Sequence, residues 1–197
     1  NPQPRLIRQV AEQFQTGALV ALPTDASYVL ACHLEDRTAV DRMRQLRGID
    51  EKHLLTLLCR DLSELSQYAQ VDNRQFRFLK EWTPGAYTFI LPATREVPRR
   101  LMHPSRKTVG LRVPEAPIVQ ALLAELGVPL LCASLILPGD EDPLSDPDDI
   151  EDRIGKRIDL LVDGGAGQLE ATSVIDVTGD EPVIQRVGLG PVEAMLR

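Results

Sequence analysis

Short apolar runs and amphipathic segments alternate along most of this chain, and their order limits the folds that the chain can adopt. Apolar runs predict strands at 18–22, 28–32, 54–59, 87–91, 108–113, 129–137, 159–162, 173–176 and 183–186. Helical spacing and capping residues predict helices at 5–15, 36–46, 61–69, 72–81, 98–102, 116–126 and 148–154. Because several strands follow one another without a helix between them, the pattern predicts a single α/β domain over residues 1–197. Its sheet is expected to be twisted, mixed parallel and antiparallel, and flanked by helices.

Size and composition indicate an ordinary globular protein. The chain has 197 residues, of which 43% are hydrophobic and 26% are charged, as is typical of soluble domains. No apolar run approaches the ~20 residues that a membrane span needs, and no signal-peptide pattern opens the chain. We therefore expect a cytoplasmic protein with no membrane partner. The scattered positions of Cys32, Cys59, Cys132 and the three histidines predict reduced thiols and no metal site.

The net charge of −7 conceals a segregation of charge along the chain. Eight carboxylates and no cation lie between residues 140 and 152, and the rest of the chain holds 21 acidic and 22 basic residues. Basic residues gather in two groups, which can create a locally positive surface on an acidic protein. The first group fits solvated helix faces equally well, whereas the denser second group favours an anion-facing role. The groups are Arg37, Arg42, Arg44, Arg47, Lys52 and Arg60, and Arg95, Arg99, Arg100, Arg106, Lys107 and Arg112 with His103.

A polar segment, Pro23-Thr24-Asp25-Ala26-Ser27-Tyr28, directly follows the first expected strand. A buried strand that ends in such a loop is one way to build the floor of a polar site. The same residues also fit an ordinary turn whose side chains cap their own backbone. No Walker loop occurs, and the glycine-rich stretch 164–167 opens no expected helix. Any bound nucleotide is therefore expected to be held by side chains and loop amides.

Several longer segments carry a resemblance to a known family. Together with 23–28 and Arg186, they are 46–53, 83–91, 108–114, 131–139 and 172–176. In this order and at this spacing they resemble the YrdC-like family over roughly residues 18–187. The segments 61–66, 83–91 and 96–101 are similar to its YciO branch.

The resemblance implies a single YrdC-like domain with a basic concave cleft. Well-understood family members are threonylcarbamoyl-AMP synthases, which combine L-threonine, bicarbonate and ATP and release pyrophosphate, as a step toward threonylcarbamoyladenosine in tRNA. ATP would thus be a substrate, with Mg²⁺ as its usual companion, and no other cofactor is implied. Family proteins are also described as binders of double-stranded RNA or tRNA, so RNA is an expected partner beside ATP, AMP and L-threonine.

The resemblance also implies roles for individual residues. Attack at the α-phosphate builds negative charge, so fixed cations are needed. For Arg112 the alternative is a structural ion pair, and for Ser134 it is a hydroxyl bonded to nearby backbone. The implied catalytic residues are Arg47, Lys52 and His53; the threonine-binding residues are Thr24, Arg112 and Cys132; the nucleotide-binding residues are Thr108, Ser134 and Arg186; the RNA-binding residues are Arg95, Arg99, Arg100, Arg106 and Lys107.

Two positions depart from the synthase pattern. The synthases carry Lys-x-Arg followed by a Lys, and later Ser-x-Asn. Here Ile49 takes the place of the arginine and Ile136 that of the asparagine, while either Lys52 or His53 falls on the later lysine. Isoleucine carries neither charge nor a side-chain hydrogen-bond donor. The sequence therefore predicts an adenylate cleft with weakened synthase activity, and the alternative is a nucleic-acid-binding or ribosome-associated protein without catalysis.

Overall fold

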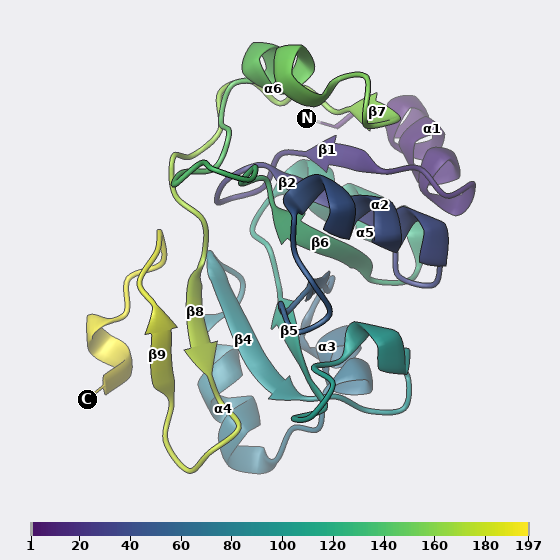
Figure 1. Ribbon diagram of the computed structural model, residues 1–197. Helices are drawn as coiled ribbons and strands as arrows, with labels where there is room; N and C mark the ends of the chain where they lie inside the picture. Colours follow the sequence, from purple (N-terminus) through teal and green to yellow (C-terminus); the bar gives the residue numbers. More distant parts are fainter. Residues whose placement is uncertain (1, 197) are drawn as a thin grey trace.

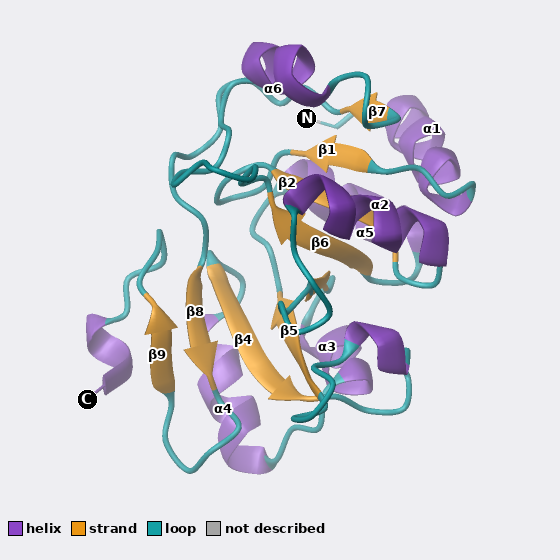
Figure 2. Cartoon of the chain, viewed as in Figure 1, coloured by secondary structure: helices purple, strands orange, loops and turns teal. Residues whose placement is uncertain are grey.

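The computed structural model describes residues 2–196, which form a nine-stranded sheet and its covering helices (Figures 1 and 2). The strands are β1 (Val20–Leu22), β2 (Val29–His33), β3 (Thr56–Leu58), β4 (Tyr87–Pro92), β5 (Thr108–Arg112), β6 (Leu130–Ser134), β7 (Leu160–Leu161), β8 (Ser173–Asp176) and β9 (Val183–Arg186). The helices are α1 (Pro4–Gln15), α2 (Arg37–Arg47), α3 (Leu62–Tyr68), α4 (Asn73–Trp82), α5 (Pro117–Leu126) and α6 (Pro147–Ile154), with short 3₁₀ turns η1 (Arg99–Leu101) and η2 (Glu193–Leu196).

Local sequence signals account for the helix ends. The carboxylates of Asp36, Asp61 and Asp72 accept hydrogen bonds from backbone N–H groups in the first turns of α2, α3 and α4, which satisfies donors that the helix leaves free. Gly127 ends α5 in the left-handed conformation, where a side chain is disfavoured. The predicted helices are confirmed, and η2 was not predicted.

One strand is shorter than its apolar run. The run from 129 to 137 predicted a strand of that length, but β6 ends at Ser134. Beyond it the N–H of Leu135 donates to the carbonyl of Tyr28, and the N–H of Ile136 turns back to the carbonyl of Ser134. The apolar side chains of Leu135 and Leu137 are still buried, so burial continues after regular pairing stops.

The sheet has the order β7-β1-β2-β6-β3-β5-β4-β8-β9. Three neighbouring pairs are parallel, β1 with β7, β3 with β5, and β4 with β8, and the other pairs are antiparallel. The prediction of a mixed sheet in a single α/β domain is therefore confirmed.

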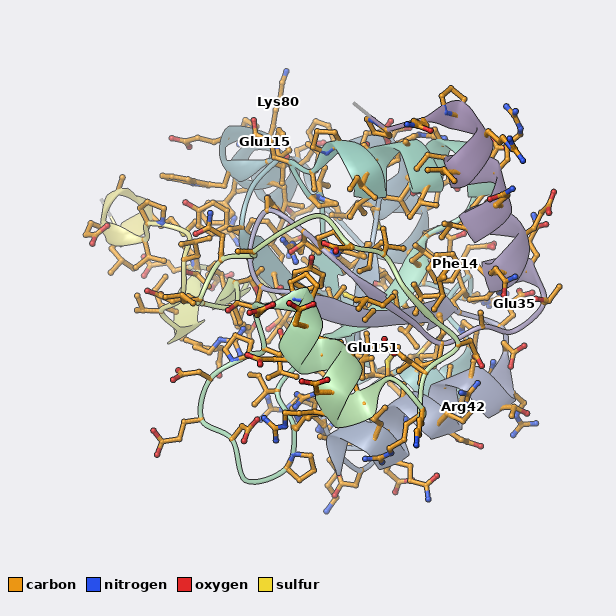
Figure 3. All side chains as sticks on the ribbon, turned by 90° about the horizontal axis from the view of Figure 1, so that it is seen from above. Phe14, Glu35, Arg42, Lys80, Glu115 and Glu151 are labelled. Atoms are coloured by element: carbon orange, nitrogen blue, oxygen red, sulfur yellow. The ribbon has the colours of Figure 1, made fainter. Side chains whose placement is uncertain are left out.

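The two faces of the sheet are covered differently. On one face the apolar residues of α2, α3, α4 and α6 join those of the strands in one large core cluster. On the other face α1 and α5 cover β1, β2, β6 and the end of β3; Phe14 of α1 is fully buried there (Figure 3). Figure 1 shows α4 behind β4 and β8, and in the described chain no helix lies on their near side. This bare half of the second face positions the candidate site.

Candidate functional site

In the bare part of the sheet, threonines and a glycine lie among the apolar side chains. The register places Thr56 of β3 beside Gly110 of β5, Gly110 beside Ile90 of β4, and Thr88 beside Val174 of β8. These five residues line a cavity of about 330 Å³. A Cβ atom on Gly110 would lie 2.8 Å from Thr56 Oγ1 and 3.2 Å from Thr88 Cγ2. Glycine at this position therefore keeps the floor of the cavity open.

Two guanidinium groups enter this cavity from distant parts of the chain. Arg47 ends α2 and Arg186 ends β9. Arg186 donates from Nε and Nη2 to the carbonyl of Thr172, at 3.1 and 2.8 Å. Arg47 donates from Nη1 to the carbonyl of Ile136, while its buried Nε has no hydrogen-bond partner among residues 2–196.

The charges of Arg47 and Arg186 are not neutralised within the cavity. Burial lowers the pKa of both groups, and the charge of Arg186 lowers the pKa of Arg47 further. The cavity lining, all within the described chain, is otherwise neutral apart from the titratable His53 and contains no carboxylate. Two half-desolvated cations in one cavity attract an anion strongly. Ser134, at the end of β6, adds a half-buried hydroxyl to the same lining.

A second cavity, of about 770 Å³, adjoins the first. The two share His53, Leu54 and Ile90, and the larger one adds Lys52, Arg106, His103, Thr108 and Asp176. Thr108 Oγ1 is buried without a partner in the described chain. Desolvation and the nearby charges of Arg47 and Arg44 lower the pKa of His53, although part of the residue is exposed. Of the two candidates for the second lysine position, His53 lines both cavities and Lys52 only the larger.

Arg112 ends β5, two residues after Gly110, and is almost completely buried, with 3% of its side chain exposed. Its Nη2 donates to Thr24 Oγ1 at 3.2 Å and forms an ion pair with Asp25. Thr24 Oγ1 also donates to the carbonyl of Ser27 at 2.7 Å and accepts from the N–H of Ala26 at 3.0 Å. The loop is thus an ordinary capped turn, and it also holds Arg112. The ion-pair alternative for Arg112 applies, and this residue lines neither cavity.

Cys132 of β6 lies opposite Thr56 of β3 in the register of the sheet. Its side chain belongs to the core cluster under α1 and α5. Burial raises the pKa of its thiol to about 12, and the charge of Arg112 opposes this shift. Cys132 is therefore a neutral thiol packed next to Arg112.

The second basic group is divided by the fold. Arg106 lines the 770 Å³ cavity, whereas Arg95, Arg99 and Lys107 line a separate cavity of about 570 Å³. Arg100 donates to the carbonyls of Leu34 and Glu35 at 3.3 and 3.0 Å. The expected RNA-binding residues are thus divided between two cavities, and Arg100 is bonded to backbone carbonyls.

In the first basic group, two members form ion pairs at the surface. Arg42 pairs with Asp159 at 2.7 Å, and Arg60 lies 3.6 Å from Asp61. Exposed pairs of this kind contribute little to stability. Arg47 is the arginine of this group that reaches the smaller cavity, so the solvated-face interpretation holds for much of the group.

The two isoleucines that are predicted to depart from the synthase pattern differ in their surroundings. Ile136 lines the smaller cavity and offers Arg47 its backbone carbonyl. Ile49 packs against the large core cluster instead. Ile136 therefore gives the cavity lining an apolar side chain, whereas Ile49 contributes to the core.

Sequence reasoning missed the floor residues. Thr56, Thr88, Gly110 and Thr172 all line the cavity, and the hydroxyls of Thr88 and Thr172 are 2.7 Å apart. The available signal was the small or polar residue in an otherwise apolar strand.

Among residues 2–196, no helix is long and apolar enough to cross a membrane. No group of three or more His, Cys, Asp or Glu side chains in that range is arranged to hold a metal ion.

Comparisons with known proteins identify the family and agree with this fold. The family model Sua5/YciO/YrdC, described as "Telomere recombination", matches residues 12–188. The YciO protein of Escherichia coli K12 is 51% identical over 100% of this chain and 95% of its own, and its crystal structure superimposes with a TM-score of 0.96. A threonylcarbamoyl-AMP synthase of Vibrio vulnificus YJ016 is 27% identical over 91% of this chain and 97% of its own. The P. abyssi Sua5 structure complexed with L-threonine is 26% identical, with a TM-score of 0.87, over 95% of this chain and 55% of its own.

Proposed function

The chain belongs to the Sua5/YciO/YrdC family, and we propose that its cleft binds L-threonine together with ATP or an adenylate. The observation that carries this proposal is the uncompensated pair Arg47 and Arg186 in a cavity with the Ser134 hydroxyl. A cavity of this kind suits a phosphate group. Relatives of this chain are threonylcarbamoyl-AMP synthases, and a related Sua5 structure holds L-threonine.

The proposed chemistry is that of the synthases. The amine of threonine and bicarbonate form a carbamate with loss of water, and an oxygen of the carbamate attacks the α-phosphate of ATP and expels pyrophosphate. Arg47 and Arg186 would stabilise the negative charge that builds on the phosphate oxygens. In the two adjoining cavities Asp176 is the one carboxylate of the described lining, and Thr178 donates to its Oδ1 from both N–H and Oγ1. Mg²⁺ would therefore be held mainly by the phosphates of ATP.

We further propose that synthesis is weak in this protein. Loss of one preorganised donor typically reduces turnover by a factor of ~10²–10³, and both Ile49 and Ile136 stand where the synthases have donors. Restoring the polar residues in an Ile49→Arg/Ile136→Asn variant is expected to increase threonine-dependent pyrophosphate release. A variant that binds ATP but releases no more pyrophosphate than the wild type would contradict this explanation.

The direct test is calorimetry with ATP, AMP and L-threonine, each alone and in pairs. We expect nucleotide binding by the wild type, and a loss of roughly tenfold or more in affinity for Arg186→Ala, as for other charge-assisted contacts. Arg112→Ala should instead weaken L-threonine. A wild type that binds none of the three ligands, and shows no pyrophosphate release dependent on threonine and bicarbonate, would overturn the proposal.

RNA binding without catalysis is the second candidate, favoured by the cations of the segment 93–107, which line two cavities. An RNA backbone that crosses this segment could meet Arg106 in one cavity and Arg95, Arg99 and Lys107 in the other. Affinity for double-stranded RNA or tRNA should then fall steeply with salt. Reversal of Arg95, Arg99 and Arg106 to Glu should abolish it, while reversal of the paired surface residue Arg42 should not. Unchanged affinity in the triple variant would exclude this surface.

A further inference from the structure

Three residues from neighbouring strands form a connected set of hydrogen bonds in the wall of the 330 Å³ cavity. Thr88 belongs to β4, Thr172 directly precedes β8, and Arg186 ends β9; Figure 1 shows these three strands side by side. All three residues line the cavity. Thr88 and Thr172 are buried, with 8% and 5% of each residue exposed. Their hydroxyls therefore interact with one another and with whatever occupies the cavity.

The guanidinium of Arg186 sets the orientation of the Thr172 hydroxyl. Donation from Nε and Nη2 to the carbonyl of Thr172, at 3.1 and 2.8 Å, holds the guanidinium beside this residue. In this position Nη2 also lies 3.4 Å from Thr172 Oγ1. A hydroxyl dipole orients in the local field, so a neighbouring cation attracts its oxygen and repels its proton. The proton of Thr172 Oγ1 therefore points away from Arg186.

This orientation determines which threonine donates in the Thr88–Thr172 pair. The two Oγ1 atoms are 2.7 Å apart, and the distance alone allows either of them to be the donor. Because the lone pairs of Thr172 face Arg186, its proton is donated to Thr88 Oγ1. A hydroxyl carries one proton and two acceptor sites, so Thr88 accepts this bond and keeps its own proton. That proton is left for an acceptor in the cavity.

The opposite direction would give the cavity the opposite polarity. If Thr88 donated to Thr172, its hydroxyl would present only lone pairs to a ligand, and lone pairs repel an anion. The direction set by Arg186 instead turns a neutral hydroxyl into a donor next to two cations, Arg47 and Arg186. In such a chain each hydrogen bond polarises the next one.

We propose that Thr88 is an anion-binding residue whose hydroxyl donates to a phosphate-type oxygen, and that Thr172, oriented by Arg186, is the positioning residue that sets its direction. The inference rests on the proposed function and adds to it a neutral donor on the floor of the cleft. Arg186 then acts on the ligand in two ways, through its charge and through the two hydroxyls.

The first test is the affinity for inorganic pyrophosphate, measured by calorimetry on the wild type, Thr88→Val and Thr88→Ser. Thr88→Val should lose roughly tenfold or more, as for other hydrogen bonds to a charged group. Thr88→Ser keeps the hydroxyl and should bind like the wild type. Thr83→Val is the matched control, because the Thr83 hydroxyl donates to the carbonyl of Leu79 at 2.7 Å and lies outside both cleft cavities. Unchanged affinity in Thr88→Val overturns the inference, and tighter binding would show that the hydroxyl pair has the opposite direction.

A double-mutant cycle tests the positioning role of Thr172. Thr172→Val keeps the backbone carbonyl that holds Arg186 but removes the hydroxyl, so it should weaken pyrophosphate binding by itself. Because Thr172 acts through Thr88, the double variant Thr88→Val/Thr172→Val should bind like Thr88→Val alone. Two independent structural effects would multiply instead. Multiplied losses, or an unchanged affinity in Thr172→Val, overturn the positioning role even if Thr88→Val does not fold.

Titration of ATP into the same samples separates the inference from the proposed function. A wild type that binds neither ATP nor pyrophosphate overturns both. A wild type that binds both ligands, with the affinity of Thr88→Val unchanged, overturns the inference and leaves the proposed function intact. Thermal unfolding of each variant shows whether a loss of affinity reflects a loss of folded protein.

Discussion

Substitution of Arg47 by methionine should separate anion binding from stability. In the folded protein Arg47 donates one hydrogen bond, to the carbonyl of Ile136, and leaves its buried Nε without a partner in the described chain. Loss of a bond from a charged donor costs about 1.5–3 kcal/mol, and removal of a buried unsatisfied donor recovers about 1–3 kcal/mol. The repulsion from Arg186 disappears as well.

These contributions largely offset one another. The free energy of unfolding of Arg47→Met should therefore stay within about 1 kcal/mol of the wild type, a Tm shift of less than about 4 °C for a chain of this size. The affinity for inorganic pyrophosphate should fall roughly 10- to 100-fold, because one charge-assisted contact is lost. Thermal unfolding and calorimetry measure the two quantities on the same samples.

Arg44→Met is the matched control for this experiment. Arg44 lies almost one helical turn earlier in α2, and its guanidinium donates to the carbonyls of Asp50 and Arg100, outside the cavity lining. This variant should retain its pyrophosphate affinity. If Arg47→Met binds pyrophosphate like the wild type, or if both variants lose affinity equally, the assignment of an anion site to Arg47 and Arg186 is wrong.

Three further outcomes are expected. Tyr28→Phe removes a hydroxyl that donates to Gly165 O at 2.7 Å and accepts from Gly164 N–H at 3.1 Å, so urea denaturation should show a loss of about 1–2 kcal/mol; an unchanged midpoint would contradict this role. The lowered pKa of His53 means that the unfolded chain binds its proton first. Below pH ~6.5 the wild type should thus lose stability relative to His53→Gln, whereas parallel pH profiles would argue against it. Burial of all three cysteines, with the pKa of Cys132 raised to about 12, predicts that thiol reagents label the protein only after unfolding; rapid labelling of the native protein would refute this.

Local sequence determined the elements of this protein and the side of each that is buried. The apolar period distinguishes strand from helix, and capping residues such as Asp36, Asp72 and Gly127 mark helix ends that the structure confirms. Such signals involve residues only a few positions apart, so a strand, a helix or a helix end can be recognised from the sequence alone. Of the residues named from the resemblance to a known family, Arg47, Ser134 and Arg186 line one cavity.

The tertiary structure alone decided which of these residues meet. Arg112 pairs with Asp25, which lies 87 positions earlier in the sequence. Arg47 and Arg186 line the same cavity although they are far apart in the sequence. The second basic group, continuous in sequence, is divided between two cavities. Sheet order and the uncovered half of one face arise from pairing between distant strands, which a pattern within one strand does not encode. Neighbours across the sheet therefore follow from the fold, while the local sequence sets only what each strand presents.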